Sequence, residues 1–228
     1  MTRNAILFDL DGTLVDSVPD LAAAANTLLG ELGRPPLSLA QVTGMVGDGA
    51  AKLVERALAA SGVTDAPPSR VLDRFLALYE ADPTRLTRAY DGVSQVLDQL
   101  AAAGFRLGVC TNKPERATRA VLSGLRLERY FPVVLGGDSG PTRKPDAGPL
   151  CTAVERLGSQ PGSAAMIGDH RNDVAAARAA GMPVIFARYG YGAATLRDLA
   201  PDAFIDRFTE LPEAIRLIWQ SRSGPSAR

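Results

Sequence analysis

Short apolar runs recur along this chain, the first of them Ala5-Ile6-Leu7-Phe8. Runs of this length bounded by turn residues are typical of strands buried on both faces. From Gly92 onward they alternate with amphipathic stretches, several of which end at glycine, a common helix stop. The pattern predicts strands over 5–8, 106–111, 133–137, 164–168, 184–187 and 203–205, and helices over 93–103, 114–123, 147–157, 171–180 and 211–219.

Alternating strands and helices predict an α/β fold whose core is a doubly wound, Rossmann-like parallel sheet. Right-handed crossovers place the carboxyl ends of all strands along the same edge of such a sheet. Open α/β folds bind their ligands at that edge. The residues that directly follow each predicted strand are therefore the first candidates for a functional site.

The segment after the first strand breaks this alternation. From about Pro19 to Arg88 no convincing strand pattern occurs, and helical periodicity predicts helices over 20–33, 38–43, 50–61 and 69–81. We therefore expect an α/β core domain from 1–16 and 90–220, an inserted α-helical cap domain from 17–89, and a flexible tail from 221–228. The cap should lie over the strand edge that carries the first acidic residues.

Composition and charge exclude several function classes. Lys plus Arg and Asp plus Glu each number 25, and no basic stripe suggests nucleic-acid binding. No apolar run is long enough to cross a membrane, and no signal peptide is recognisable, so we expect a cytoplasmic protein. The two cysteines, Cys110 and Cys151, have neither metal-site spacing nor a disulfide framework. Whether the protein is a monomer or a homodimer stays open.

Two carboxylates follow the first strand at once, in the segment Asp9-Leu10-Asp11-Gly12-Thr13. Side chains two residues apart in an extended segment point the same way, so Asp9 and Asp11 should face one small volume. Two carboxylates this close repel each other unless a cation or a shared proton lies between them. The pair therefore suggests a hard metal ion.

Polar residues also follow the later strands. Thr111, Asn112 and Lys113 come after the second, and a hydroxyl before a helix start can bind phosphate. Asp138 follows the third strand, and its position fits either an acid of the functional site or an acid in a surface turn. The remaining candidates are Arg143, Lys144, Asp169 and Asp173. Acids, one hydroxyl and one lysine at a strand edge suit phosphoryl transfer with Mg²⁺.

Four segments carry a resemblance to a known family: FDLDGTLVDS at 8–17, CTNKP at 110–114, RKP at 143–145 and GDHRNDV at 168–174. With them the chain resembles the haloacid-dehalogenase-like phosphohydrolases that carry a helical cap between the first strand and the second motif. The stretches GGDSGPTRKP and GDHRNDVAAARAAGM are similar to the phosphoglycolate phosphatase subgroup. The resemblance covers essentially the whole chain except its tail.

The resemblance implies a catalytic role for each of four residues. Asp9 would be the nucleophile that forms an aspartyl-phosphate. Asp11 would protonate the leaving oxygen and then activate the hydrolytic water. Thr111 and Lys144 would bind the phosphoryl oxygens. A general acid must carry its proton near neutral pH, so the Asp11 side chain should point away from the metal.

The resemblance also implies a Mg²⁺ cofactor. The ion would be bound by Asp9, by the backbone carbonyl of Asp11 and by Asp169, with Asp173 contributing directly or through water. The implied reaction converts 2-phosphoglycolate and water to glycolate and phosphate. His170 departs from the subgroup, in which a small residue is expected at that position.

Further substrate-binding candidates are Asn112 after the second strand and Gly47 and Asp48 in the predicted cap. Gly47 and Asp48 could read the substrate or simply form a turn between two helices. Lys113 could line the site or open the following helix. His170, as a lone histidine, is more often structural than catalytic.

Other functions stay open at this stage. A phosphatase of the same fold could act on a sugar phosphate, a nucleotide or pyrophosphate, and a β-phosphoglucomutase-like phosphomutase would need a cap that excludes water. Phosphonate cleavage and dehalogenation are disfavoured because neither calls for an acid at Asp11. A non-catalytic scaffold of this fold could lose Asp9, Asp11, Lys144 or Asp169, and all four are present.

Overall fold

The computed structural model describes residues 4–63, 68–196 and 200–223, and six of its strands form one parallel sheet. Strand order across the sheet is β5-β4-β1-β6-β7-β8. The strands are β1 (Ala5–Phe8), β4 (Arg106–Cys110), β5 (Val133–Leu135), β6 (Ala164–Gly168), β7 (Val184–Ala187) and β8 (Ala203–Ile205). Every pairing in this sheet is parallel. The predicted α/β fold class is confirmed.

Apolar side chains cover both faces of the sheet. In β1, Ile6 and Phe8 belong to one buried apolar cluster, whereas Ala5 and Leu7 belong to another. This division follows from the two-residue period of a strand. The first cluster includes residues of α5 (Val93–Ala102), α6 (Glu115–Gly124) and α9 (Leu211–Ser223), and the second includes residues of α7 (Gly148–Arg156) and α8 (Arg171–Ala179). The sheet is therefore sandwiched between two helical layers.

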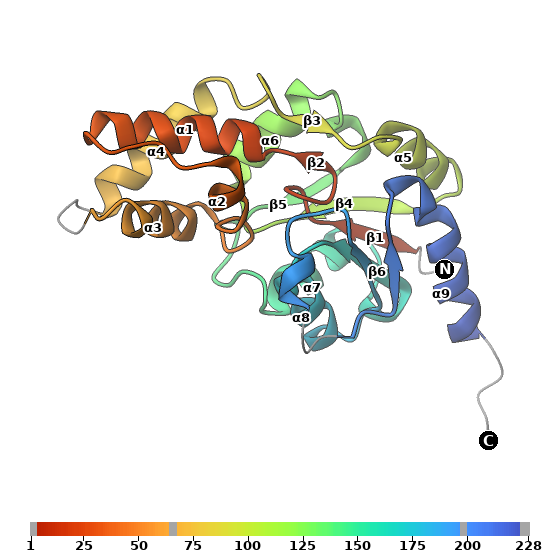
Figure 1. The fold of residues 1–228 in the computed structure, drawn as a ribbon. Coiled ribbons are helices and arrows are strands. Elements are labelled where there is room, and N and C mark those ends of the chain that lie inside the picture. Colours follow the sequence, from red (N-terminus) through yellow and green to blue (C-terminus); the bar gives the residue numbers. More distant parts are fainter. Residues whose placement is uncertain (1–3, 64–67, 197–199, 224–228) are drawn as a thin grey trace.

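Four helices are inserted between the first two strands of the parallel sheet, and we call residues 18–81 the helical insertion. They are α1 (Val18–Glu31), α2 (Leu39–Thr43), α3 (Ala50–Ala60) and α4 (Pro68–Ala81). Figure 1 shows α1, α3 and α4 grouped at the left of the molecule, to one side of the sheet. This is the segment in which the sequence predicted helices and no strand.

A small hairpin that the sequence pattern did not predict connects the helical insertion to the sheet. β2 (Val15–Asp16) pairs antiparallel with β3 (Arg88–Ala89), with Val15 opposite Ala89 and Asp16 opposite Arg88. Two-residue strands are too short to show a two-residue period. The chain thus leaves and re-enters the core at adjacent points.

The remaining element boundaries differ from the prediction by a few residues. The third strand ends at Leu135 rather than at 137, and the last helix continues to Ser223, beyond the expected start of the tail at 221. Residues 224–228 lie outside the described residues. Single 3₁₀ turns span Glu128–Tyr130, Pro161–Ser163, Ala193–Thr195 and Phe208–Glu210. Within the described ranges, no helix is both long and apolar enough to span a bilayer.

A buried carboxylate holds the two chain segments at the base of the helical insertion together. Asp20, near the start of α1, accepts hydrogen bonds from the backbone N–H of Leu86 at 2.9 Å and of Thr87 at 2.7 Å. It also accepts one from the Thr87 hydroxyl at 2.7 Å. Removing this carboxylate would leave several buried donors without a partner.

We predict that Asp20→Ala lowers the free energy of unfolding by about 2–4 kcal/mol, because unpaired buried donors keep their full desolvation penalty. Urea denaturation would measure the change. Asp73→Ala is the matched control, since Asp73 is exposed on α4 and its loss should change stability by less than about 0.5 kcal/mol. Equal effects of the two substitutions would contradict the role given to Asp20.

Candidate active site

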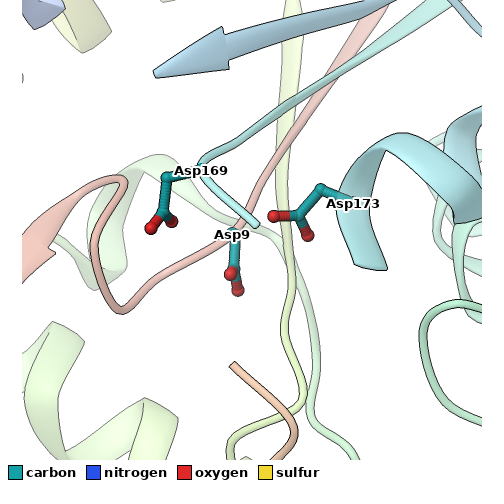
Figure 2. Close-up of side chains that lie close together, drawn as sticks. All are labelled: Asp9, Asp169 and Asp173. Atoms are coloured by element: carbon teal, nitrogen blue, oxygen red, sulfur yellow. The ribbon is translucent and has the colours of Figure 1, made fainter. Parts of the chain in front are cut away.

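Three buried carboxylates meet at the carboxyl edge of the sheet. Asp9 directly follows β1, Asp169 directly follows β6, and Asp173 lies in the first turn of α8. One oxygen of each lies within 4.8 Å of an oxygen of the other two. Figure 2 shows the three side chains gathered around one volume. The structure thus brings together three of the four predicted metal ligands through their side chains.

A buried lysine lies against two of these carboxylates. The Lys144 Nζ is 3.1 Å from Asp9 Oδ1 and 2.5 Å from Asp173 Oδ1. Burial by itself would lower the pKa of Lys144, but the charges of Asp173 and Asp9 outweigh it and raise that pKa. Lys144 therefore stays cationic and neutralises part of the charge of the cluster.

The cluster contains three carboxylates and one lysine, and the pKa values of two of the carboxylates are raised. Burial raises the pKa of Asp9 and raises that of Asp169 well above its ordinary value. The charges of Asp9 and Asp173 add to the effect at Asp169. A group of buried, negatively charged oxygen donors fits a hard divalent cation such as Mg²⁺. The residues present therefore match the predicted cofactor.

Backbone and hydroxyl donors hold Asp169 in place. Its Oδ1 accepts from the Thr13 hydroxyl at 2.8 Å, and its Oδ2 accepts from the N–H of Tyr191 at 2.8 Å. Gly12 has a φ of 85°, and a Cβ there would lie 2.3 Å from Asp169 Oδ2. A Cβ on Gly190 would lie 2.3 Å from the Asp169 Cβ. Only glycine allows both loops to approach this carboxylate so closely.

Asp11 points to a different set of partners. Its carboxylate accepts from the Ser17 hydroxyl at 2.5 Å and from Lys113 Nζ at 3.0 and 3.1 Å. Its side chain is outside the three-carboxylate cluster. This agrees with the expectation that Asp11 points away from a metal, whereas a contact through its backbone carbonyl stays a prediction. Lys113, left undecided by the sequence, is buried in the site.

Thr111 and Asn112 line the same cavity as Asp9 and Asp11. A hydrogen bond from the Thr111 side chain favours the ionised form of Asp9 and so lowers its pKa, against the larger effect of burial. The Asn112 Nδ2 donates to the backbone oxygens of Gly47 and Lys144, both at 3.0 Å. Asn112 therefore joins the loop that carries Lys144 to the helical insertion.

The predicted cap residues Gly47 and Asp48 contact α8. The Asn172 Nδ2 donates to the Gly47 oxygen at 3.2 Å and to Asp48 Oδ1 at 2.8 Å. Arg56 forms an ion pair with Asp48. Partial burial opposes ionisation of Asp48, but the Asn172 and Arg56 hydrogen bonds outweigh it and lower the pKa. The carboxylate thus fixes the loop, and a substrate contact of these residues stays a prediction.

His170 caps α8. Its Nδ1 accepts from the N–H of Asn172 at 3.3 Å, and its backbone N–H donates to Asp173 Oδ2 at 2.9 Å. A Cβ on Gly47 would lie 2.6 Å from the His170 ring, so the imidazole packs directly against the loop. Burial lowers the pKa of His170. These contacts support the structural interpretation of the histidine.

Asp138 also caps a helix. Its Oδ1 accepts from the N–H of Glu115 at the start of α6, at 2.8 Å. It is outside the carboxylate cluster. Of the two readings that the sequence left open, the turn acid is the one that the structure favours.

Sequence reasoning missed the contribution of two tyrosines in the loop after β7. The Tyr191 hydroxyl donates to Asp16 Oδ1 at 2.7 Å and accepts from the N–H of Ser17 at 2.8 Å. The Tyr189 hydroxyl donates to the Thr13 oxygen at 2.8 Å. The Tyr-Gly-Tyr-Gly repeat at 189–192 was the only available signal, and its partners lie more than 170 residues away.

A cavity lies between the helical insertion and the strand edge. The side chains that the insertion contributes to the cavity lining are mainly apolar, and those that the core contributes are mainly polar. The core residues are Asp9, Asp11, Thr111, Asn112, Lys113, Pro114 and Ala117, and the insertion residues are Leu21, Val46, Gly47, Gly49, Ala50, Leu53, Phe75, Leu76 and Tyr79. The cavity thus has the acids on its core side and apolar side chains on its insertion side.

This fold and this strand-edge set of acids define a class of hydrolase. Residues 6–187 match the family model of the haloacid dehalogenase-like hydrolases, and the chain belongs to that family.

Within the family, the chain is similar to proteins named phosphoglycolate phosphatase. One from Rhodospirillum rubrum is 46% identical over 213 residues, which cover 91% of this chain and 88% of that protein. Another, from Cereibacter sphaeroides, is 41% identical and covers 92% and 97% of the two chains. The crystal structure of a predicted phosphoglycolate phosphatase from Haemophilus somnus superposes with a TM-score of 0.87 at 31% identity, covering 94% of this chain and 99% of that one.

The raised pKa of Asp169 has a consequence for stability. The folded protein binds a proton at Asp169 more tightly than the unfolded chain does. The contribution of this residue to the free energy of unfolding therefore falls as the pH rises above about 4. Asparagine carries no charge, so in EDTA Asp169→Asn should gain stability relative to wild type as the pH rises above about 4.

Urea denaturation of both proteins at several pH values measures this trend, and Asp138→Asn serves as the control at an exposed acid outside the cluster. Adding Mg²⁺ should stabilise the wild type and Asp138→Asn but not Asp169→Asn. A stability difference between Asp169→Asn and wild type that stays flat with pH would show that the carboxylate is not destabilised by its burial.

Proposed function

We propose that this protein, a phosphoric monoester hydrolase by its family and relatives, hydrolyses 2-phosphoglycolate to glycolate and phosphate with Mg²⁺ as cofactor. The observation that carries the proposal is the convergence of Asp9, Asp11 and Thr111 on one cavity, with Lys144 in contact with Asp9 and the carboxylate cluster beside it. The names of the relatives support the choice of substrate.

In the proposed reaction, a carboxylate oxygen of Asp9 attacks phosphorus and the bond from phosphorus to the glycolate oxygen breaks. Asp11 gives its proton to the departing oxygen. Water then attacks the aspartyl-phosphate while Asp11 takes up a proton, which releases phosphate and restores Asp9. The position of the Asp11 carboxylate outside the three-carboxylate cluster supports a role for it apart from the metal.

Positive charge near the phosphoryl group would come from Lys144 and from the cofactor. Asp9, Asp169 and Asp173 would hold Mg²⁺, which when bound supplies positive charge to the phosphoryl oxygens. The Lys144 ammonium, 3.1 Å from Asp9 Oδ1, can bind an oxygen of a phosphoryl group attached there. The Thr111 hydroxyl, which hydrogen-bonds to Asp9, would donate to another phosphoryl oxygen.

The helical insertion would act as a cap that encloses the substrate. The hydrogen bonds of Asn112 and Asn172 to Gly47 and Asp48 support this role, because they hold an insertion loop over the strand edge. An ion pair between Glu80 of α4 and Arg116 of α6 adds a second contact. Enclosure would exclude bulk water and strengthen the electrostatic interactions in the site.

Phosphate release from 2-phosphoglycolate, with and without Mg²⁺, tests the proposal. We expect Mg²⁺-dependent turnover in wild type, no turnover in Asp9→Asn, and a loss of about 10²–10⁴-fold in kcat for Asp11→Asn, the range for removing a general acid. Asp138→Asn is the control acid at a strand end, and its activity should stay near that of wild type.

The substrate assignment is tested separately with a panel of sugar phosphates, nucleoside monophosphates and pyrophosphate. A higher kcat/KM for any of these would overturn 2-phosphoglycolate and leave the mechanism standing. Net transfer of phosphate between positions of a sugar phosphate would instead indicate a phosphomutase. Turnover by Asp9→Asn equal to that of wild type would refute the nucleophile.

A further inference from the structure

One lysine that lines the cavity, Lys113, has no role of its own in the proposed reaction. Lys113 is the only cationic side chain among the described residues that line this cavity. It is 6% exposed. Burial of an ammonium is unfavourable unless anions or π-electron systems compensate for the lost water. The neighbours of Lys113 therefore indicate what else it could bind.

Two kinds of neighbour surround the Lys113 ammonium. Asp11 accepts two hydrogen bonds from its Nζ, at 3.0 and 3.1 Å. The Nζ also lies 4.3 Å from the centroid of the Tyr79 ring, which comes from α4 of the helical insertion. An ammonium has three N–H donors. Two serve Asp11, and the third is left for the Tyr79 side chain or for a further acceptor in the cavity.

The Tyr79 hydroxyl is a second donor at this point. Tyr79 is 2% exposed and lines the cavity, and its Oη is buried without a hydrogen-bond partner among the described residues. Burial raises the pKa of this phenol, so the group keeps its proton. A buried hydroxyl without a partner is unfavourable in a folded protein. An acceptor on a bound molecule would satisfy it.

The start of α3 faces the same cavity through Gly49 and Ala50. Gly49 is the N-cap and makes no side-chain hydrogen bond to the first-turn N–H groups. A Cβ at Gly49 would lie 2.8 Å from the backbone oxygen of Asn112, and φ is 88°, so a capping side chain does not fit there. The first-turn N–H groups, which no side chain caps, and the helix dipole favour an anion.

We propose that Lys113, the Tyr79 hydroxyl and the start of α3 form the subsite for the carboxylate of the leaving group. This inference rests on the proposed function. Asp11 must touch the leaving oxygen to protonate it, and Lys113 touches Asp11. The carboxylate of glycolate is one carbon removed from that oxygen, which brings it within reach of the Lys113 ammonium.

The subsite combines groups from both parts of the molecule. Lys113 follows β4 of the core, whereas Tyr79 and Gly49 belong to the helical insertion or its loops. The remaining insertion residues that line the cavity are mainly apolar. A substrate with a neutral group in place of the carboxylate would therefore find no hydrogen bonds comparable to those of the subsite. The subsite would therefore select small phosphate esters that carry an acid group next to the ester carbon.

The test compares 2-phosphoglycolate with ethyl phosphate, which has a methyl group in place of the carboxylate. In Tyr79→Phe, which removes one oxygen and keeps the ring over Lys113, we expect kcat/KM for 2-phosphoglycolate to fall about tenfold or more, as for other lost hydrogen bonds to a charged group. For ethyl phosphate it should change by less than about threefold. In Lys113→Met both rates should fall, since Lys113 contacts Asp11, but the preference for 2-phosphoglycolate should also fall at least about tenfold.

The control is Tyr130→Phe, because the Tyr130 hydroxyl bonds to Asp98 far from the cavity and should leave the preference unchanged. The ratio of the two kcat/KM values on one preparation is independent of the fraction of folded enzyme. A wild type without preference for 2-phosphoglycolate would refute the proposed substrate and this subsite together. A preference that survives both Tyr79→Phe and Lys113→Met would refute the subsite alone.

Discussion

The contact of one buried lysine with two buried carboxylates is the constraint on which the strand-edge site depends. Lys144 lies between Asp9 and Asp173, and the three side chains come from three different segments of the core. Without the lysine, Asp9, Asp169 and Asp173 would place three like charges in a volume from which water is excluded. The backbone around the cluster is correspondingly tight, with Gly12 and Gly190 packed against Asp169.

A second ion pair, between Lys113 and Asp11, lies at the same edge of the sheet and shares no side chain with the first. Asp11 is two residues from Asp9, yet its carboxylate is held by Ser17 and Lys113. The two carboxylates of the pair therefore have different partners, although they are two residues apart. The helical insertion is joined to this edge by hydrogen bonds from Asn112 and Asn172 to one short loop.

Much of this arrangement is predictable from the order of apolar and polar residues. Three of the apolar runs that became strands are followed at once by a polar group of the site: Phe8 by Asp9, Cys110 by Thr111 and Gly168 by Asp169. Parallel strands with right-handed crossovers bring those groups to one edge whatever the rest of the chain does. The β2–β3 hairpin escaped prediction because two residues carry no period.

The sequence by itself determined the fold class, the family and which acids share an edge, because these follow from local periodicity and short motifs. Only the tertiary structure decided the partners of the polar residues. Lys113 meets Asp11 across 102 positions, Asn172 meets Asp48 across 124, and Tyr191 meets Asp16 across 175. The first and third contacts join segments that follow different core strands, and the second depends on where the helical insertion packs against the core. No local pattern encodes either, because both depend on how distant segments pack together.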